Sequence, residues 1–266
     1  MRLRRAARFS LWTIVALLTV YAALAYVLLP VLWTHYEQQP ALAGRPMITR
    51  TADGIPGDPL NVGLVGHERE LVEAISAAGW HPADPITVKT SLAIVGSVMF
   101  DRPYLRAPVS NLYYEGRKQD FAFEAPAGTS ANRRHHVRFW KVLDRGAEGR
   151  PVWLGSSAFD TGSGLSSYTG QVTHHISPDV DAERDFFLTS LTKVGMLDRI
   201  YAVTGVGPML NGRNGGGDRY FTDGEVEIGV INKGALPSQE PPDLVPSPLP
   251  VELKDQLFDA IGDLLD

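Results

Sequence analysis

Four of the seven histidines stand as two adjacent pairs, and arginines flank the first pair. His135 and His136 lie in the run 133–140, which also holds three arginines, and His174 and His175 form the second pair. Imidazole nitrogens bind Zn²⁺ and similar ions or transfer protons near neutral pH, and guanidinium groups bind phosphate or carboxylate bidentately. If this protein performs chemistry, we expect it at these two runs.

The first hypothesis is a metal-assisted hydrolase. Neighbouring residues on a strand point to opposite faces, so each histidine pair offers one member to a common site. His136 with His174 or His175, completed by Asp160 or Asp181, would give three protein ligands and an open position on a divalent metal such as Zn²⁺. The sequence does not decide which member of each pair faces the pocket. Because no HExxH-type spacing is present, histidines that only form structural hydrogen bonds are the alternative.

The arginines indicate the class of substrate. Arg134 and Arg138 would hold a phosphate, and Arg117 is a further candidate from an upstream hairpin, where a solvent-facing side chain is its default. These residues predict hydrolysis of a phosphoester outside the membrane. A second hypothesis needs no metal, since one histidine would transfer protons while the arginines, with Arg184, bind the anion. Arg184 lies in an acid-rich helix start, which favours a local ion pair instead.

The third hypothesis is a non-catalytic interaction module in cell-envelope assembly. It fits the absence of an established catalytic motif, the proline-rich linker predicted over residues 233–250 and the short amphipathic helix predicted over 251–266. The two termini of this chain would then serve as an anchor and a contact surface. A silent domain should tolerate His136→Ala in vivo, whereas a hydrolase should not.

Two further motifs resemble known catalytic loops. Asp160 begins an Asp-Thr-Gly sequence, but aspartic proteases need two such carboxylates and one copy occurs here, so we interpret Asp160 as a turn residue or a metal ligand. Residues 211–218 are rich in glycine, yet they lack the Lys-Ser/Thr ending of a nucleotide-binding P-loop. A mobile hairpin loop over a site is the simpler interpretation.

Composition excludes several functions. The 266 residues carry a net charge of −5, and the first ten hold four arginines and no acid, so the remainder has 21 basic against 30 acidic residues, or −9. Nucleic-acid binding requires a basic face, so no nucleic-acid partner is expected. The absence of cysteine excludes disulfides, thiolate metal sites and cysteine nucleophiles.

An N-terminal membrane anchor is predicted. Residues 9–33 contain no charged side chain, and Trp12, Tyr26 and Trp33 lie near the ends of this run, where interfacial aromatics belong. The alternative is a signal peptide, which the length of the run and the missing A-x-A site disfavour. The arginines before it predict a single-pass, N-in anchor, with everything after about Thr34 outside the cytoplasm.

The remaining elements predict an α+β domain over residues 60–232, with a largely antiparallel sheet and two or three packed helices. Residues 1–33 form the basic tip and anchor, and residues 34–59, broken by four prolines, are expected to be a tether. If 134–142 is a strand, His136, Arg138 and Trp140 share one face. The expected helices are 67–79, 90–100 and 179–195. The expected strands are 60–65, 109–114, 117–124, 134–142, 152–159, 171–176, 199–206 and 219–231.

Several motifs resemble one bacterial family. The segments 107–120, 134–140, 173–176 with Thr-His-His-Ile, and 181–185 with Asp-Ala-Glu-Arg-Asp are similar to the LssY C-terminal domain family, over roughly residues 60–231. The resemblance implies a bacterial envelope protein, found in company with DedA-type or lipid-phosphatase membrane domains. With the N-in anchor, it places the chain in the inner membrane, the C-terminal domain in the periplasm and the phosphate-containing substrate in the envelope. The family's activity is unassigned, so the resemblance supplies no catalytic residue. This chain departs from those fusions in having one anchor helix and no polytopic domain.

Overall fold

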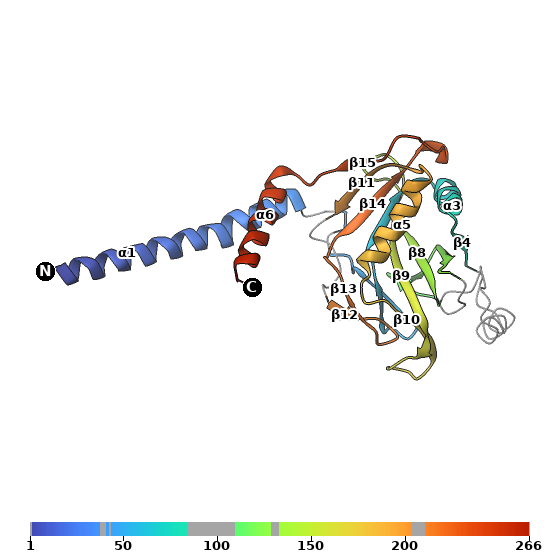
Figure 1. Ribbon diagram of the computed structural model, residues 1–266, viewed down its shortest axis with the longest axis horizontal. Helices are drawn as coiled ribbons and strands as arrows, with labels where there is room; N and C mark the ends of the chain where they lie inside the picture. The colour runs from blue at the N-terminus through green and yellow to red at the C-terminus, as the bar shows by residue number, and fades with distance from the viewer. Residues whose placement is uncertain are drawn as a thin grey trace. The chain divides into compact units, whose positions relative to one another are not determined.

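The computed structural model describes residues 2–37, 41–42, 44–83, 110–128, 133–203 and 211–265, in two compact units (Figure 1). One unit comprises Met1–Ala41 and Ser247–Asp266, and the other comprises Leu42–Pro246. The helix predicted over 90–100 lies outside the described residues. The second unit contains the histidines and arginines that the sequence singled out.

A long apolar helix dominates the first unit. It runs through α1 (Arg2–Ala23), η1 (Leu24–Leu28), α2 (Leu29–Leu32) and η2 (Trp33–Glu37). The stretch Ser10–Glu37 has a mean hydropathy of 2.4 and is long and apolar enough to cross a membrane, a criterion that a signal sequence also meets. In η1 the Leu29 N–H bonds to the Leu24 carbonyl. This wider turn precedes Pro30, which has no N–H to donate.

The C-terminal helix α6 (Leu249–Leu265) belongs to the same unit. Lys254 Nζ lies 2.5 Å from the Glu37 carboxylate at the end of the long helix. The leucines of α6 recur on one side of the helix, as the amphipathic pattern predicted, and Leu253, Leu257 and Leu264 are exposed. The predicted C-terminal helix is therefore confirmed, with its start two residues earlier.

Nine strands of the described residues form the main sheet of the second unit. Their order is β15-β11-β14-β3-β9-β8-β7-β4, and β10 pairs with β9. Two of the pairings, β3 with β14 and β11 with β15, are parallel, and the others are antiparallel. This confirms the predicted α+β class. The strands are β3 (Val62–Val65), β4 (His81–Pro82), β7 (Phe121–Pro126), β8 (Arg134–Leu143), β9 (Val152–Leu165), β10 (Val172–Ile176), β11 (Leu197–Val203), β14 (Val226–Ile231) and β15 (Asp243–Val245).

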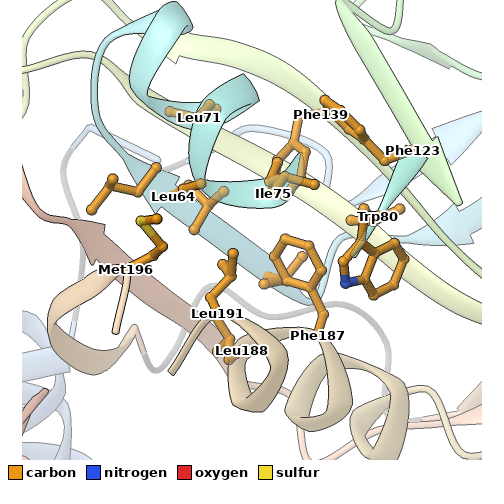
Figure 2. Packing of buried hydrophobic residues seen from close by; sticks show 14 of the residues in the cluster. Leu64, Leu71, Ile75, Trp80, Phe123, Phe139, Phe187, Leu188, Leu191 and Met196 are labelled. Atoms are coloured by element: carbon orange, nitrogen blue, oxygen red, sulfur yellow. The ribbon is translucent and has the colours of Figure 1, made fainter. Parts of the chain in front are cut away.

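Two helices, α3 (Glu68–Ala77) and α5 (Asp181–Lys193), cover one face of this sheet. Figure 2 shows how Leu71 and Ile75 of α3 and Phe187 of α5 meet side chains of the strands, among them Leu64 and Phe139. These side chains are almost completely buried, so each contributes about 1.5–3 kcal/mol of transfer free energy. This apolar layer packs the sheet against the helices and determines which side chains of β8 point into the core.

Local signals set the bounds of α3. The His67 backbone N–H donates to the Glu70 carboxylate (2.7 Å), which closes a capping box at the start. At the other end, Gly79 has a φ of 85°, and the Trp80 N–H returns to the Ile75 carbonyl. The sequence predicted this helix and its glycine C-cap, and both are confirmed.

A smaller sheet lies on the opposite face and corrects the predicted tether. Its order is β2-β1-β5-β6, built from β1 (Ile48–Arg50), β2 (Pro56–Pro59), β5 (Tyr113–Tyr114) and β6 (Arg117–Lys118). Tyr114 packs on Trp140, with ring centroids 6.1 Å apart. Residues 34–59 were predicted to be a tether because four prolines interrupt them and they show no apolar periodicity. Strands β1 and β2 are too short to show such a pattern, but they pair with each other.

The predicted linker over 233–250 also contains structure. Lys233–Ala235 form the short helix η3, and β15 pairs in parallel with β11 at the edge of the main sheet. Prolines are tolerated around an edge strand because one side of its backbone needs no ladder partner. The hairpin predicted at Glu115-Gly116 is confirmed between β5 and β6, where these two residues have φ angles of 48° and 76°.

Candidate functional site

Strand β8 carries a row of charged side chains on the face opposite the helices. Arg134 pairs across the ladder with Asp160 of β9, Arg138 pairs with Ser156, and His136 lies opposite Glu124 of β7. Directly paired residues in an antiparallel sheet point to the same face. The alternation predicted from the sequence is thus confirmed: the His136 face is polar, and Val137 and Phe139 enter the apolar core. Each named polar side chain is almost fully buried.

His136 lies between two carboxylates. Its Nδ1 is 3.3 Å from Asp160 Oδ1, and its Nε2 is 4.0 Å from Asp58 Oδ2. Neither ring nitrogen has a well-aligned hydrogen-bond partner among the described residues. Burial by itself lowers the pKa of His136, but the charge of Asp160, with the nearby Asp58, outweighs burial and raises the pKa above its usual value. A fully buried imidazole is thereby biased toward its cationic form.

Arg134 joins two buried carboxylates. Its Nε donates to Asp160 Oδ2 (2.8 Å), and its Nη1 donates to Glu124 Oε2 (2.9 Å). Burial would raise the pKa of Asp160, but the charges of His136 and Arg134 lower it well below its usual range. Asp160 is therefore an ionised, buried ion-pair partner rather than a turn residue. The sequence placed it after an apolar strand, but it lies within β9, and its partners Arg134 and His136 come from β8.

Arg138 and Asp58 form the second buried pair. Arg138 Nη1 lies 3.2 Å from Asp58 Oδ2, and its Nε donates to the Ser110 carbonyl. Asn214 Nδ2 donates to Asp58 Oδ1 (3.2 Å). Burial would raise the pKa of Asp58, but His136 and Arg138 lower it. A guanidinium carries five N–H donors, so Arg138 keeps donors for a further acceptor.

The glycine-rich segment is a hairpin loop beside these charges. Strands β12 (Asn211–Arg213) and β13 (Arg219–Phe221) pair antiparallel. The Asn214 carboxamide oxygen accepts from the Gly216 and Asp218 N–H groups (3.0 and 2.9 Å) and so fixes the loop. This confirms the predicted hairpin. No sequence pattern indicated Asn214 and Asp58 as site residues, because Asp58 lies in the predicted tether and Asn214 lies in a loop without a catalytic motif.

A cavity of about 230 Å³ opens in front of this network. Side chains from four strands and the loop 214–216 border it, and the hydroxyls of Ser166 and Thr169 come from the β9–β10 connection. The charged and imidazole side chains that line it are Asp53, Asp58, Arg134, His136, Arg138, Asp160 and His174. The cavity therefore combines two cationic guanidiniums, three carboxylates and two imidazoles.

The two members of the second histidine pair have different environments. His174 lines the cavity, and burial, with the charges of Arg134 and His136, lowers its pKa despite the opposing effect of Asp160. His175 turns the other way, and its Nδ1 lies 2.6 Å from Asp218 Oδ1. The predicted convergence of both pairs therefore involves His136 and His174. His135 likewise faces away, toward the Glu183 carboxylate at 2.9 Å.

Other predicted residues lie outside the cavity. Arg117 donates to the Lys141 carbonyl (2.8 Å) and lies near Asp120, so its role as a substrate ligand is not supported by position. Arg184 pairs with Asp185 (2.9 Å) and Asp223 (3.0 Å), which agrees with the favoured ion-pair interpretation. Asp181 accepts hydrogen bonds from Thr222 and the Asp223 N–H instead of joining the histidines.

In the described ranges, no three His, Asp or Glu side chains are arranged as the ligands of a metal ion. His136, His174 and Asp160 nevertheless border one cavity, and imidazole and carboxylate groups are suitable ligands for Zn²⁺. The metal hypothesis from the sequence stays a prediction. His175, the third predicted ligand, would have to leave Asp218 to join them.

Comparison with known protein families assigns most of the chain to one family. The LssY C-terminus family matches residues 36–226. This range agrees with the resemblance seen in the sequence motifs and extends it upstream, across β1 and β2, so that it includes Asp58 and all the charged residues of the cavity. No curated protein and no solved structure matches the chain.

Proposed function

Given that the chain belongs to the LssY C-terminus family, we propose that its domain hydrolyses a phosphate-containing substrate of the bacterial envelope. One observation supports this most directly: His136 and His174 border the same cavity, and their environments move their pKa values in opposite directions. Pairs of titratable groups with pKa values moved apart are typical of acid–base catalysis. The two guanidiniums beside them suit an anionic substrate.

The proposed reaction uses each imidazole in one protonation state. His174, neutral at pH 7, accepts a proton from a water molecule whose oxygen attacks phosphorus. The ester P–O bond breaks, and cationic His136 donates its proton to the leaving oxygen. Arg138 donates its remaining N–H groups to the phosphoryl oxygens, while Asp58 and Asp160 stabilise the imidazolium and hold it in place.

In a second version of the mechanism, the same residues would bind a divalent metal such as Zn²⁺. His136, His174 and Asp160 would hold it, and the metal would supply an activated water near neutral pH. The two versions differ in metal content. Full-length protein purified in detergent should contain close to one metal per chain, lost in His136→Ala, if the metal version holds.

The activity test uses phosphomonoester and phosphodiester substrates at fixed protein concentration. His136→Ala and His174→Ala should each reduce turnover by about 100-fold or more, the usual contribution of a positioned acid or base. Arg117→Ala, a hairpin arginine outside the cavity, is the matched control and should keep wild-type turnover. Wild-type protein that neither binds nor hydrolyses any phosphoester, with or without added Zn²⁺ or Mn²⁺, would contradict the proposal.

The location of the domain is part of the proposal. The basic N-terminal tip and the apolar helix suit an N-in anchor, which would put the domain in the periplasm. Substrates built from envelope phosphates would meet the cavity there. The envelope assignment rests on this topology and on the family resemblance.

A non-catalytic interaction module is the second candidate, and α6 favours it. Leu253, Leu257 and Leu264 are 56%, 59% and 84% exposed on one side of this helix. Exposed apolar side chains in such a row are typical of a contact surface. Cells carrying His136→Ala should then behave as wild type, whereas removal of residues 249–266 should cause the phenotype of a full deletion. The opposite pattern supports the hydrolase.

A further inference from the structure

The rim of the cavity continues into exposed apolar side chains. On β10, residues two apart share a face, so Val172 points the same way as His174. Val172 borders the cavity and is nevertheless 81% exposed. Its partner across the ladder is Leu165 of β9, which is 63% exposed. One face of the β9–β10 hairpin therefore changes from ionic to apolar within a few residues.

The turn of this hairpin extends the apolar rim and is held in position. Tyr168, at the turn, is 53% exposed. Ser166 Oγ donates to the Gly215 carbonyl, and the Ser167 N–H donates to the Gly216 carbonyl, so the turn is bonded to the loop that also borders the cavity. The apolar rim (Leu165, Tyr168 and Val172) thus has a defined position relative to the charged floor.

Large apolar side chains that are exposed beside a polar cavity are typical of a binding site whose ligand has an apolar part. From this arrangement, and resting on the proposed function, we infer that the substrate is a phosphate-bearing amphiphile of the membrane. Its phosphate enters the cavity, and the first part of its alkyl chain lies on the apolar rim. Connectivity supports a membrane source. The candidate membrane span ends at Glu37, and the cavity-bearing unit starts at Leu42 of the same chain.

The test compares two phosphomonoesters with full-length protein in phosphatidylcholine vesicles. Hexadecyl phosphate, carried in the vesicles, has an alkyl chain, whereas phenyl phosphate in solution lacks one. Wild-type protein should have a lower KM for hexadecyl phosphate. The double variant Leu165→Thr/Val172→Thr has β-branched side chains, which suit strands, at both positions but loses apolar contact area. It should raise the KM for hexadecyl phosphate about tenfold and change that for phenyl phosphate less than twofold.

A matched control is available on β15, the edge strand of the main sheet. Leu244 of β15 is 70% exposed and does not border the cavity, so Leu244→Thr should leave both KM values unchanged. Equal effects of the double variant on the two esters, or no preference of the wild type for hexadecyl phosphate, would overturn the inference and leave the hydrolase intact. Absence of turnover of both esters, or full turnover in His136→Asn, would overturn the proposed function itself.

Discussion

At the scale of single residues, the site is a compensated set of buried charges. Arg134 contacts Asp160 and Glu124, and all three side chains are less than a tenth exposed. Removing such charges from water costs free energy, and the ion pairs offset this cost only while each guanidinium stays paired with its carboxylates. A network of this kind contributes little net stability, yet it holds the imidazole of His136 in one place. We therefore expect its geometry to serve the proposed function more than the stability of the domain.

Loss of Arg134 should destabilise the domain strongly. Arg134→Met keeps the volume of the side chain but leaves two buried carboxylates without their cation, so we expect a loss of about 3–5 kcal/mol in the free energy of unfolding. Arg117→Met removes an arginine that is half exposed and should cost less than about 1 kcal/mol. Urea unfolding followed by tryptophan fluorescence measures both. Equal effects would show that the buried network is not the cause.

The charge of His136 should make stability depend on pH in a defined direction. Its pKa is raised in the folded state, so its stabilising contribution is complete below the unfolded value of about 6.5 and is lost as the pH rises through the folded pKa. The pKa values of Asp58 and Asp160 are lowered in the folded state. Their contributions to stability are therefore lost at acidic pH, as the pH falls through the folded pKa values. His174, whose pKa is lowered, opposes His136 near neutrality.

Comparison with a variant isolates the contribution of His136. The difference in unfolding free energy between wild type and His136→Asn should shrink as the pH is raised from about 6 to about 9. The other titrating groups are present in both proteins and largely cancel. A difference that grows over this range would mean that the imidazole is neutral in the folded protein, and the assignment of His136 as the acid would be wrong.

At the scale of elements, β9 organises the site. Its first half lies between β3 and β8 in the core, and its second half carries Asp160 and pairs with β10. Gly164 lies beneath the His175 ring, and a Cβ built there would collide with it. The ring is thus free to reach Asp218, whose other oxygen accepts from the Ile176 N–H. One glycine therefore permits the contact that joins β10 to the glycine-rich loop.

Two glycines on this strand form a matched pair for mutation. Gly164→Ala should displace His175 from Asp218 and destabilise the domain by about 1–3 kcal/mol, the usual cost of overpacking. Gly162→Ala, two residues earlier, meets no atom within 4 Å of the added Cβ and should change stability by less than about 0.5 kcal/mol. Thermal unfolding by circular dichroism compares them. Similar effects would indicate that His175 does not depend on the space at Gly164.

At the scale of the whole molecule, the chain joins an apolar helix to a domain with a charged cavity. The sequence contains no cysteine, so single cysteines report topology without background. Asp144→Cys, on a side chain that is 89% exposed, should react with a membrane-impermeant maleimide in intact spheroplasts. Ala7→Cys, within the basic tip, should react only after lysis. The reverse pattern would place the domain in the cytoplasm, and a shortened chain lacking the helix would identify a cleaved signal sequence.

The sequence by itself determined the fold class, the apolar helix, the two flanking helices and the alternation of side chains along β8. These features depend on local patterns, namely hydrophobic periodicity, caps and the two-residue repeat of a strand, which act over a few residues. The family resemblance rested on such local motifs too, and the match over residues 36–226 confirmed it. His136, Arg138 and Trp140 were therefore assigned to one face before any tertiary contact was known, whereas the member of each histidine pair that faces the pocket was left open.

Tertiary structure alone decided which residues meet. Asp58 comes from a strand too short to produce a periodic pattern, and it reaches Arg138 across 80 residues of sequence. Asn214 reaches Asp58 across 156 residues, and the choice between His174 and His175 depends on the pairing of β10 with β9. Buried charges are paired wherever the fold brings opposite charges together, and a linear sequence does not encode those distances. The cavity and its apolar rim therefore became visible only in three dimensions.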